Sequence, residues 1–169
     1  LALTYDDVLL VPQYSNIKSR QEVEIKSGLD ETLEFSLPVI SSPMDTVTET
    51  DMAYSMSING GLGIIHRYNS INKQAAMVKS ALSLGTTTIG AAIGVTGDFE
   101  DRATALHEAG AKIICIDVAH GHHILMRDAL CQLRNSFGDD VHIMAGNVAT
   151  LKGFNDLSDW GADSIRCNI

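Results

Sequence analysis

Short apolar segments alternate with amphipathic stretches along most of the chain, and the cycle repeats about every 25 to 30 residues. Runs of apolar residues bounded by turn residues predict six buried strands. These strands cover residues 37–42, 62–65, 88–94, 112–117, 141–146 and 162–167. Buried strands that alternate with helices are typical of a parallel sheet in an α/β fold.

Capping residues and glycines mark where the intervening helices begin and end. Asp51 lies three residues after Thr48, as in a capping box. Apolar residues recur at helical spacing, for example at Ile71, Ala75 and Val78. Helix N-caps are expected at Thr48, Ser70, Asp98 and Thr150, and helix stops at Gly60, Gly85, Gly110 and Gly161. The pattern therefore places a helix between each strand and the next.

Two architectures fit this order of elements: a doubly wound open sheet and a (β/α)8 TIM barrel. The glycine fingerprint of a dinucleotide-binding open sheet occurs at no strand-to-helix turn, since Gly90 and Gly94 lie within a predicted strand. Polar residues stand at the carboxyl ends of the predicted strands, namely Asp45, His66, Arg67, Thr96, Asp117, Asn147 and Arg166. Because those ends converge on one mouth in a barrel, where active sites are built, the pattern favours the barrel.

The chain is short for a complete barrel. Eight βα units need about 250 residues, whereas the 169 residues here accommodate five units and a sixth strand. We therefore interpret residues 1–169 as the N-terminal portion of a single barrel catalytic domain. The alternative is a non-catalytic half-barrel that requires a partner chain.

Composition and charge narrow the class of partner. Hydrophobic residues make up 45% of the chain and charged residues 20%, which is ordinary for a globular protein. A net charge of −9 repels phosphodiester backbones and anionic lipid, so we expect neither a nucleic acid nor a membrane as partner. A local basic pocket for one small phosphate is compatible with that charge.

The N-terminal residues and the cysteines indicate a cytoplasmic protein. Asp6 and Asp7 replace the basic region that begins a secretory signal. Cys115, Cys131 and Cys167 are odd in number and form no C-x-x-C pair, as expected of reduced thiols. We interpret the first two as packing residues, and Cys167 as a buried strand residue rather than a nucleophile.

Two loops contain residues that are able to bind a ligand, and these residues also have a purely structural interpretation. The hydroxyl-rich loop Ser41–Thr46 precedes a helix and is able to hold a phosphate, although an ordinary capped loop explains it as well. Asp117, at a strand end, is able to bind a ribose diol. The histidines that follow it, His120, His122 and His123, lack a nearby carboxylate in the next helix, so we predict no metal site.

Asn147 and Arg166 are the candidates on the last two predicted strands. Asn147 is placed either to donate a hydrogen bond to a ligand or to form a turn before the cap at Thr150. A charged Arg166 in a buried strand must be paired or bind an anion. It therefore indicates either an anion site or a structural ion pair.

Six stretches in order make the chain resemble the IMP dehydrogenase/GMP reductase family. They are Leu3–Pro12, Ser42–Glu49, Gly60–His66, Asp117–His122, Ala145–Thr150 and Gly161–Arg166. Together they cover essentially the whole chain, and six motifs in order are far more specific than any one.

The resemblance implies a (β/α)8 barrel, usually a homotetramer, that acts on a purine nucleotide with a nicotinamide cofactor. In IMP dehydrogenase, a cysteine attacks C2 of IMP, hydride passes to NAD, and water releases XMP from the cysteine adduct. In GMP reductase, GMP is converted to IMP and ammonia with NADPH.

The matching motifs also imply the site residues. The purine nucleotide would be lined by Ser42, Met44, Asn147 and Arg166. The cofactor would be contacted by Asp117, Val118 and Ala119 at the nicotinamide ribose, by Thr96 near the adenosine end, and by Asn168, where the family has a glycine.

Two departures from the family pattern matter. The catalytic cysteine and the loop that binds a monovalent cation such as potassium follow the strand of Arg166, so both are expected beyond Ile169, and Cys167 is not that cysteine. Residues Leu82–Thr88 lead directly into the next predicted strand, so we expect no inserted CBS domains.

Sequence features conflict on which of the two enzymes of the family this chain resembles more. Ser42–Glu49 and Gly60–His66 favour the dehydrogenase, whereas Lys18–Val23 and the missing CBS insertion favour the reductase. We favour IMP dehydrogenase, with GMP reductase as the alternative.

Overall fold

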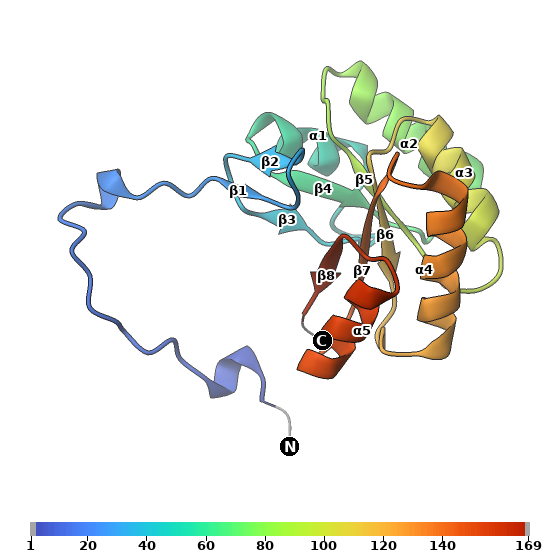
Figure 1. The fold of residues 1–169 in the computed structure, drawn as a ribbon. Coiled ribbons are helices and arrows are strands. Elements are labelled where there is room, and N and C mark those ends of the chain that lie inside the picture. Colours follow the sequence, from blue (N-terminus) through green and yellow to red (C-terminus); the bar gives the residue numbers. More distant parts are fainter. Residues whose placement is uncertain (1–2, 168–169) are drawn as a thin grey trace.

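A computed structural model describes residues 3–167, and its main feature is one curled parallel sheet of six strands in the order β3-β4-β5-β6-β7-β8. The strands are β3 (Ile40–Ser41), β4 (Leu62–Ile65), β5 (Gly90–Ile93), β6 (Ile113–Asp117), β7 (His142–Gly146) and β8 (Ser164–Arg166). A helix joins each strand to the next, and the helices lie outside the curl of the sheet (Figure 1).

The helices in the described part of the chain are α1 (Thr50–Ile58), α2 (Ile71–Ser83), α3 (Phe99–Glu108), α4 (Ile124–Phe137) and α5 (Leu151–Asp159). None of these five is long and apolar enough to cross a lipid bilayer. A doubly wound sheet would change strand order at a switch point and carry helices on both faces. The described sheet does neither, so the predicted α/β class and the predicted five βα units with a sixth strand are confirmed as a half-barrel.

Alternate residues of each strand enter two different apolar layers. In β6, Ile114 and Ile116 pack into the large core between the sheet and the helices, while Ile113 and Cys115 belong to a smaller core on the concave face. This alternation follows from the period of two in an extended strand. It also sends Asp117, the next residue of the concave set, to the rim of the half-barrel.

Helix capping confirms three of the predicted N-cap positions, Ser70, Asp98 and Thr150, and corrects the fourth, Thr48. The hydroxyls of Ser70 and Thr150 accept hydrogen bonds from backbone N–H groups of α2 and α5, as predicted. Thr48 is not the cap of α1: its side chain is fully buried, and Glu49 takes the N-cap position without a side-chain hydrogen bond. Asp98 does hold the N-cap position of α3, but its carboxylate pairs with Arg102 instead of a backbone N–H.

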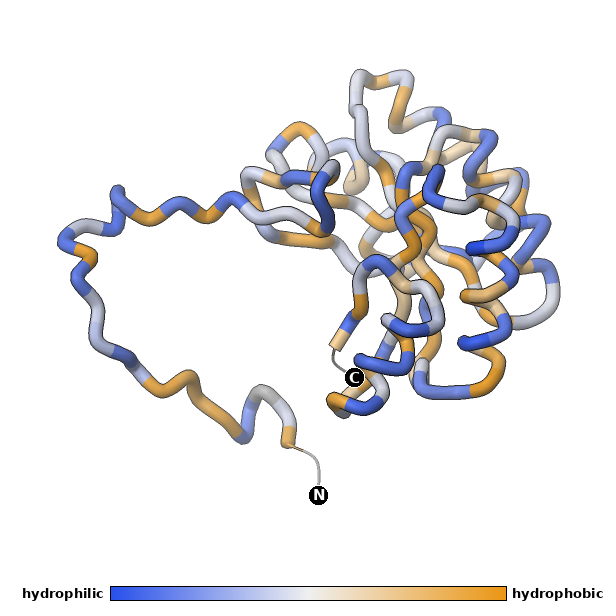
Figure 2. The backbone as a smooth tube through the Cα atoms, in the orientation of Figure 1, coloured by the Kyte–Doolittle hydropathy of each residue, from blue (hydrophilic) through white to orange (hydrophobic). Residues whose placement is uncertain are grey.

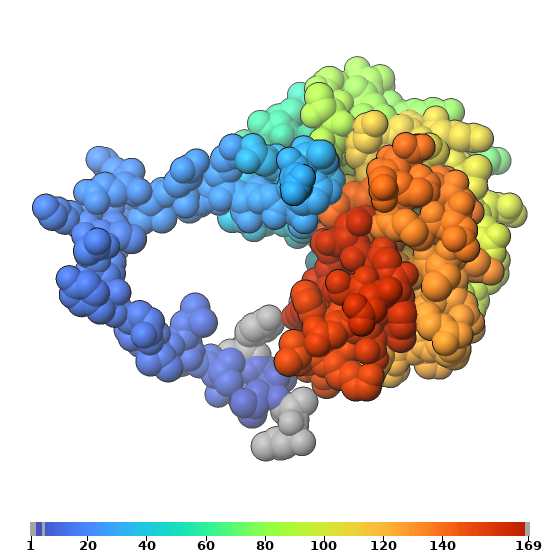
Figure 3. Space-filling model, viewed as in Figure 1, coloured from blue at the N-terminus to red at the C-terminus, as the bar shows by residue number. Residues whose placement is uncertain are grey.

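The N-terminal arm was not predicted. Residues 8–26 are exposed throughout, contain only one 3-10 turn (Arg20–Glu22), and stand away from the half-barrel over much of their length (Figures 1 and 3). Leu9 and Leu10 are 93% and 97% exposed, and they form part of the apolar stretch near the start of the arm (Figure 2). Folded chains seldom leave consecutive leucines so exposed, so this stretch is a surface that lacks cover within the described residues.

A short hairpin, also missed, covers the amino-terminal end of the half-barrel. Its antiparallel strands are β1 (Ser27–Gly28) and β2 (Glu34–Phe35). Leu29, Leu33 and Phe35 pack against the core on the concave face. Asp30, in the turn of the hairpin, contacts His142 at the start of β7.

Hydrogen bonds among three side chains, Asp30, His142 and Ser164, attach this hairpin to the sheet. The Asp30 Oδ2 atom lies 2.5 Å from His142 Nδ1, and His142 Nε2 lies 2.8 Å from the Ser164 hydroxyl at the start of β8. Burial acts to raise the pKa of Asp30, but hydrogen bonds from Thr32, His142 and the Leu33 N–H outweigh it and lower that pKa to about 2. The ionised carboxylate therefore stabilises the docked hairpin.

We expect Asp30→Asn to lower the free energy of unfolding by about 1–2 kcal/mol at pH 7, a discounted value because Asp30 keeps some solvent contact. The stabilisation from the carboxylate is complete above its unfolded-state pKa near 3.8 and is lost as the pH falls through the folded-state pKa of about 2. The difference between wild type and variant should therefore shrink between pH 4 and pH 2.

Urea unfolding across that pH range measures the difference. Asp140→Asn, at an exposed loop position, is the matched control and should leave the pH dependence unchanged. A gap between wild type and Asp30→Asn that stays constant down to pH 2 would contradict this account.

Candidate functional site

The carboxyl ends of the six strands lie along one rim of the half-barrel, and the predicted site residues that fall within residues 3–167 stand on this rim or in the loops that leave it. Asn168 and the segment after Ile169, where the nucleophile is expected, lie outside the described residues. The candidate site is therefore built from four loops, those after β3, β5, β6 and β7, and one ion pair.

The ion pair joins Arg166 to Asp117 across an intervening strand. In the register of the sheet, Asp117 of β6 is the partner of Gly146 in β7, and Gly146 is the partner of Arg166 in β8. Because Gly146 has no side chain, the Arg166 guanidinium reaches over it and its Nη1 group donates to Asp117 Oδ1. A Cβ atom on Gly146 would stand 2.6 Å from the Arg166 Cβ, so this row accepts only glycine without a shift.

This pair satisfies one of the two interpretations of Arg166. Both side chains are about three-quarters buried, with 24% and 20% of their surfaces exposed. The contact also brings together a residue expected on the nucleotide side and one expected on the cofactor side. A guanidinium has five N–H donors, so Arg166 keeps capacity for a second partner while it holds Asp117.

The loops after β6 and β7 are tied together through their backbones. The Asn147 N–H donates to the Val118 carbonyl at 2.8 Å, the Val118 N–H donates to the Gly146 carbonyl at 3.0 Å, and the Gly121 N–H donates to the Asn147 carbonyl at 2.7 Å. The side-chain oxygen Oδ1 of Asn147 is buried and has no hydrogen-bond partner among the described residues. Buried acceptors are rarely left unsatisfied, so this oxygen is a candidate contact for a ligand donor.

Buried Thr48, which the sequence pattern predicted as a helix cap, instead stabilises the loop after β3. The Thr48 hydroxyl lies 2.7 Å from the Ser42 carbonyl, to which it donates, and 2.9 Å from the Ser41 hydroxyl. The Met44 carbonyl accepts from the N–H groups of Val47 and Thr48. These bonds leave the side chains of Ser42 and Met44 exposed at the rim, where a ligand is able to reach them.

The remaining cofactor-side positions flank the ion pair. Thr96 is exposed in the loop after β5, Ala119 is exposed, and Val118 is half-buried against the large core. These positions surround Asp117 on the β5 and β6 part of the rim. The chemistry of this part of the rim suits a nicotinamide dinucleotide. The Asp117 carboxylate is able to bind a ribose diol, and the exposed positions beside it leave room for the rest of the molecule.

The histidines after β6 have structural partners. His122 Nε2 lies 2.7 Å from the Asp156 carboxylate of α5, and His123 Nδ1 accepts from the Leu125 N–H at the start of α4. Within residues 3–167 no group of three or more His, Cys, Asp or Glu side chains is arranged to hold a metal ion.

The cysteines differ from the prediction in two of three cases. Cys115 is buried on the concave face, where burial raises the pKa of its thiol to about 12, so it packs and is not a nucleophile. Cys131 is exposed, because it lies on the outer side of α4 while Leu130 faces the core. Cys167 is exposed as well, because β8 already ends at Arg166.

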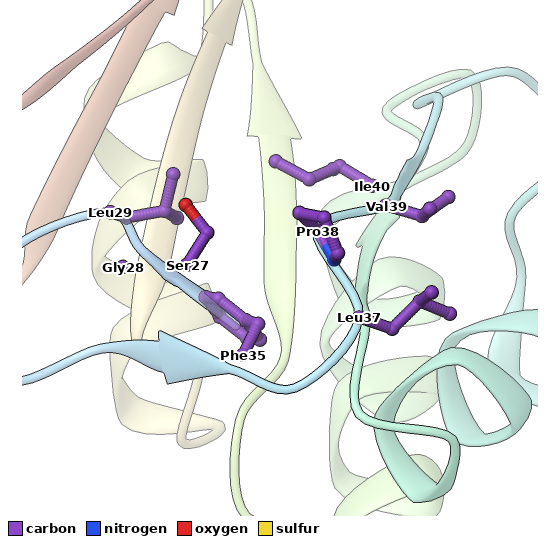
Figure 4. Close-up of a pocket in the computed structure, with 8 residues that line it drawn as sticks. All are labelled: Ser27, Gly28, Leu29, Phe35, Leu37, Pro38, Val39 and Ile40. Atoms are coloured by element: carbon purple, nitrogen blue, oxygen red, sulfur yellow. The ribbon is translucent and has the colours of Figure 1, made fainter. Parts of the chain in front are cut away.

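A pocket of about 150 Å³ lies apart from the rim (Figure 4). Its walls come from the β1–β2 hairpin and from the segment that leads into β3, and they include Leu29, Phe35, Pro38 and Ile40. The lining is almost wholly apolar and carries no convergent polar groups. We therefore assign the candidate site to the rim and not to this pocket.

Comparisons with known proteins agree on one family. The sequence pattern of the IMP dehydrogenase / GMP reductase domain matches residues 2–169. An inosine-5'-monophosphate dehydrogenase of Cryptosporidium parvum is 32% identical over 209 residues, which cover 99% of this chain and 51% of the relative. A GMP reductase of Mycoplasma mycoides subsp. mycoides is 32% identical over 167 residues, which cover 98% of this chain and 51% of the relative.

A more distant relative adds the same information. An inosine-5'-monophosphate dehydrogenase of Nitrosopumilus maritimus is 24% identical over 290 residues, which cover 99% of this chain and 61% of the relative. The chain therefore spans between half and three-fifths of the length of these curated relatives.

We expect Thr48→Val to lower the free energy of unfolding by about 1–3 kcal/mol, because the nearly isosteric valine leaves the buried Ser41 hydroxyl without its partner and removes one donor to the Ser42 carbonyl. Thr46→Val, at an exposed position of the same loop, is the control and should change stability by less than about 0.5 kcal/mol. Urea unfolding of both variants measures the two changes in the free energy of unfolding. Equal changes would show that Thr48 does not stabilise the loop.

Proposed function

This chain belongs to the IMP dehydrogenase/GMP reductase family, and on that premise we propose that the protein that carries it transfers hydride between a purine nucleotide and a nicotinamide cofactor. One observation carries the proposal. Asp117 and Arg166, which both lie in family motifs, form an ion pair at the rim where strands β6 to β8 end. A paired carboxylate and guanidinium, beside an unsatisfied amide oxygen, suit a ligand with both a diol and an acceptor-rich base.

The chain's own residues have binding and orienting roles in this proposal. Ser42, Met44, Asn147 and Arg166 line the purine nucleotide, and Asp117, Val118, Ala119 and Thr96 contact the dinucleotide, with Asn168 as the remaining cofactor-side position. When bound, the nicotinamide ring accepts or supplies the hydride. Asp117 orients the ribose next to that ring, and the hydrogen bond from Arg166 holds the Asp117 side chain in place.

Of the two family reactions we propose the dehydrogenase: IMP, NAD and water give XMP and NADH through a cysteine adduct. Support comes from Ser42–Glu49 and Gly60–His66, which resemble the dehydrogenase branch. The cysteine nucleophile and the potassium loop belong to the segment expected after Ile169. We expect a homotetramer in the cytoplasm, without nucleic acid or membrane partners.

GMP reductase is the second candidate, in which GMP and NADPH give IMP and ammonia. Two observations favour it. The alignment with the Mycoplasma reductase needs only 167 residues to cover 98% of this chain. In addition, α2 ends at Ser83 and β5 begins at Gly90, which leaves only a short connection where many dehydrogenases insert CBS domains.

A non-catalytic half-barrel that needs a partner chain is the third reading of the same residues. It predicts an obligate oligomer without turnover, so a folded, monodisperse monomer in light scattering would exclude it.

We expect the complete protein to raise nicotinamide absorbance at 340 nm with IMP and NAD and to leave it unchanged with GMP and NADPH. Absorbance that falls with GMP and NADPH instead would identify the reductase. No change with either pair, in protein that contains the cysteine loop, would contradict the proposed oxidoreductase function.

We expect Arg166→Ala to weaken binding of the purine nucleotide to the complete protein by about 1.5–3 kcal/mol, the range of a charge-assisted hydrogen bond. Calorimetric titration with IMP measures the effect. Arg127→Ala, at an exposed arginine of α4, is the control and should leave the dissociation constant unchanged. An unchanged dissociation constant in Arg166→Ala itself would remove this residue from the nucleotide site.

A further inference from the structure

A buried arginine and a buried glutamine form one polar network between α2 and α3, which pack against each other outside the sheet (Figure 1). Gln74 and Arg102 are each the fourth residue of their helix, so both lie near the end of the helix that is closer to the rim. Gln74 is fully buried, and Arg102 is 7% exposed. Arg102 Nη1 donates to Gln74 Oε1 at 2.7 Å, and we refer to this pair of side chains as the clamp.

Gln74 lies at the point where β4 and β5 separate. The two strands pair as far as Ile65 and Ala91. Beyond that row, Gln74 Nε2 donates to the Ile65 carbonyl at 3.3 Å and to the Ala92 carbonyl at 2.8 Å. Buried carbonyls need such a donor where a strand ladder ends. The glutamine amide therefore fixes the separation of the two strand ends.

Arg102 extends the clamp to the two loops that leave those strands. Its Nη2 group donates at 3.1 Å to the Asn69 carbonyl, in the loop after β4, and at 2.8 Å to Asp98 Oδ2, at the end of the loop after β5. The hydrogen bond from Arg102 is the main reason that the pKa of Asp98 is lowered, and the charge of Arg67 lowers it further. Because the donors of a guanidinium have a fixed planar geometry, this one side chain sets how far apart the two loops stand.

The loop after β5 belongs to the cofactor side of the candidate site. Gly94 directly follows β5, and the register that pairs Ile93 with Ile116 brings Gly94 to the level of Asp117. Thr96, two residues further along this loop, is exposed, whereas both side chains of the clamp are buried. The clamp is therefore able to affect a ligand only through the loops that it holds.

We propose that Arg102 and Gln74 are positioning residues for the dinucleotide cofactor, an inference that rests on the proposed function. By fixing the loop after β5, the clamp keeps Thr96, expected near the adenosine end, at a set distance from Asp117, expected at the nicotinamide ribose. A loop that is already ordered costs less free energy when the ligand binds. Loss of the clamp therefore weakens cofactor binding and spares the purine nucleotide, whose expected contacts lie at the ends of β3, β7 and β8.

The test compares Arg102→Lys with Arg134→Lys in the complete protein. Arg134 is a matched control because it also donates to three groups, the carbonyls of Gly138 and Gly161 and the carboxylate of Asp163. These groups precede β7 and β8, so they lie at the end of the sheet opposite the rim. Lysine keeps the charge but replaces the planar fork with one ammonium group, so neither variant retains the geometry of its three contacts.

We expect both variants to lower the free energy of unfolding in urea, and only Arg102→Lys to change the kinetics with the cofactor. Its KM for the dinucleotide should rise at least about fivefold, while kcat at saturating cofactor stays within about twofold, as expected when binding alone is weakened. Nicotinamide absorbance with the substrate pair that the wild type turns over measures both constants. Calorimetry with IMP or GMP should give a dissociation constant within about twofold of wild type.

Gln74→Met provides a second route to the same result, also if Arg102→Lys does not fold. Methionine is similar in volume to glutamine but donates no hydrogen bond to the two strand carbonyls. The variant should show the same rise in the KM for the dinucleotide and the same unchanged purine nucleotide affinity.

Three outcomes overturn the inference while the proposed function stands. An equal rise of the cofactor KM in Arg134→Lys would show a general loss of stability. An unchanged cofactor KM in both Arg102→Lys and Gln74→Met would show that the clamp has a structural role only. An equal loss of purine nucleotide affinity would show that the clamp does not act on the cofactor side. By contrast, a wild-type protein that turns over neither nucleotide pair would contradict the proposed function itself, and this inference with it.

Discussion

The parallel register of the six strands is the constraint on which the candidate site depends. Because side chains alternate with a period of two, one register puts Ile113, Cys115 and Asp117 on the concave face in successive rows. The same register brings Gly146 and Arg166 into the row of Asp117. A slip of one residue in β8 would turn Arg166 outward to the helices and leave Asp117 without its partner.

Two glycines on the rim lie beside an arginine, but only Gly146 makes room for one, because a Cβ atom on Gly94 would stand at an ordinary contact distance of 3.5 Å from Arg67 Nη1. Gly146 lets Arg166 cross β7 to Asp117, and Gly94 lies beneath the guanidinium of Arg67. The two arginines differ in their neighbours: Arg166 is ion-paired with Asp117, whereas Arg67 lies over the Tyr68 ring and interacts with Asp98 through charge alone.

Much of the fold could be predicted from local patterns, because buried parallel strands are continuous apolar runs and glycines end the helices. The position of the polar residues at strand ends could be predicted for the same reason. The partners could not: Arg166 meets Asp117 across 49 residues, and Asp30 meets His142 across 112. Thr48 shows that local patterns also fail over short distances in sequence. The pattern predicted a helix cap at Thr48, but its buried hydroxyl donates to the Ser42 carbonyl within the loop.

The hairpin at the amino-terminal end has a consequence for the order of events in folding. The strands β4 to β7 each pair with the next one in sequence, so their contacts close short loops and can form early. The contact of Asp30 with His142 closes a loop of 112 residues and needs β7 and β8 to be in place first. The hairpin, which precedes all six strands of the half-barrel in the chain, is therefore expected to dock last, and to be the first to detach when the half-barrel opens.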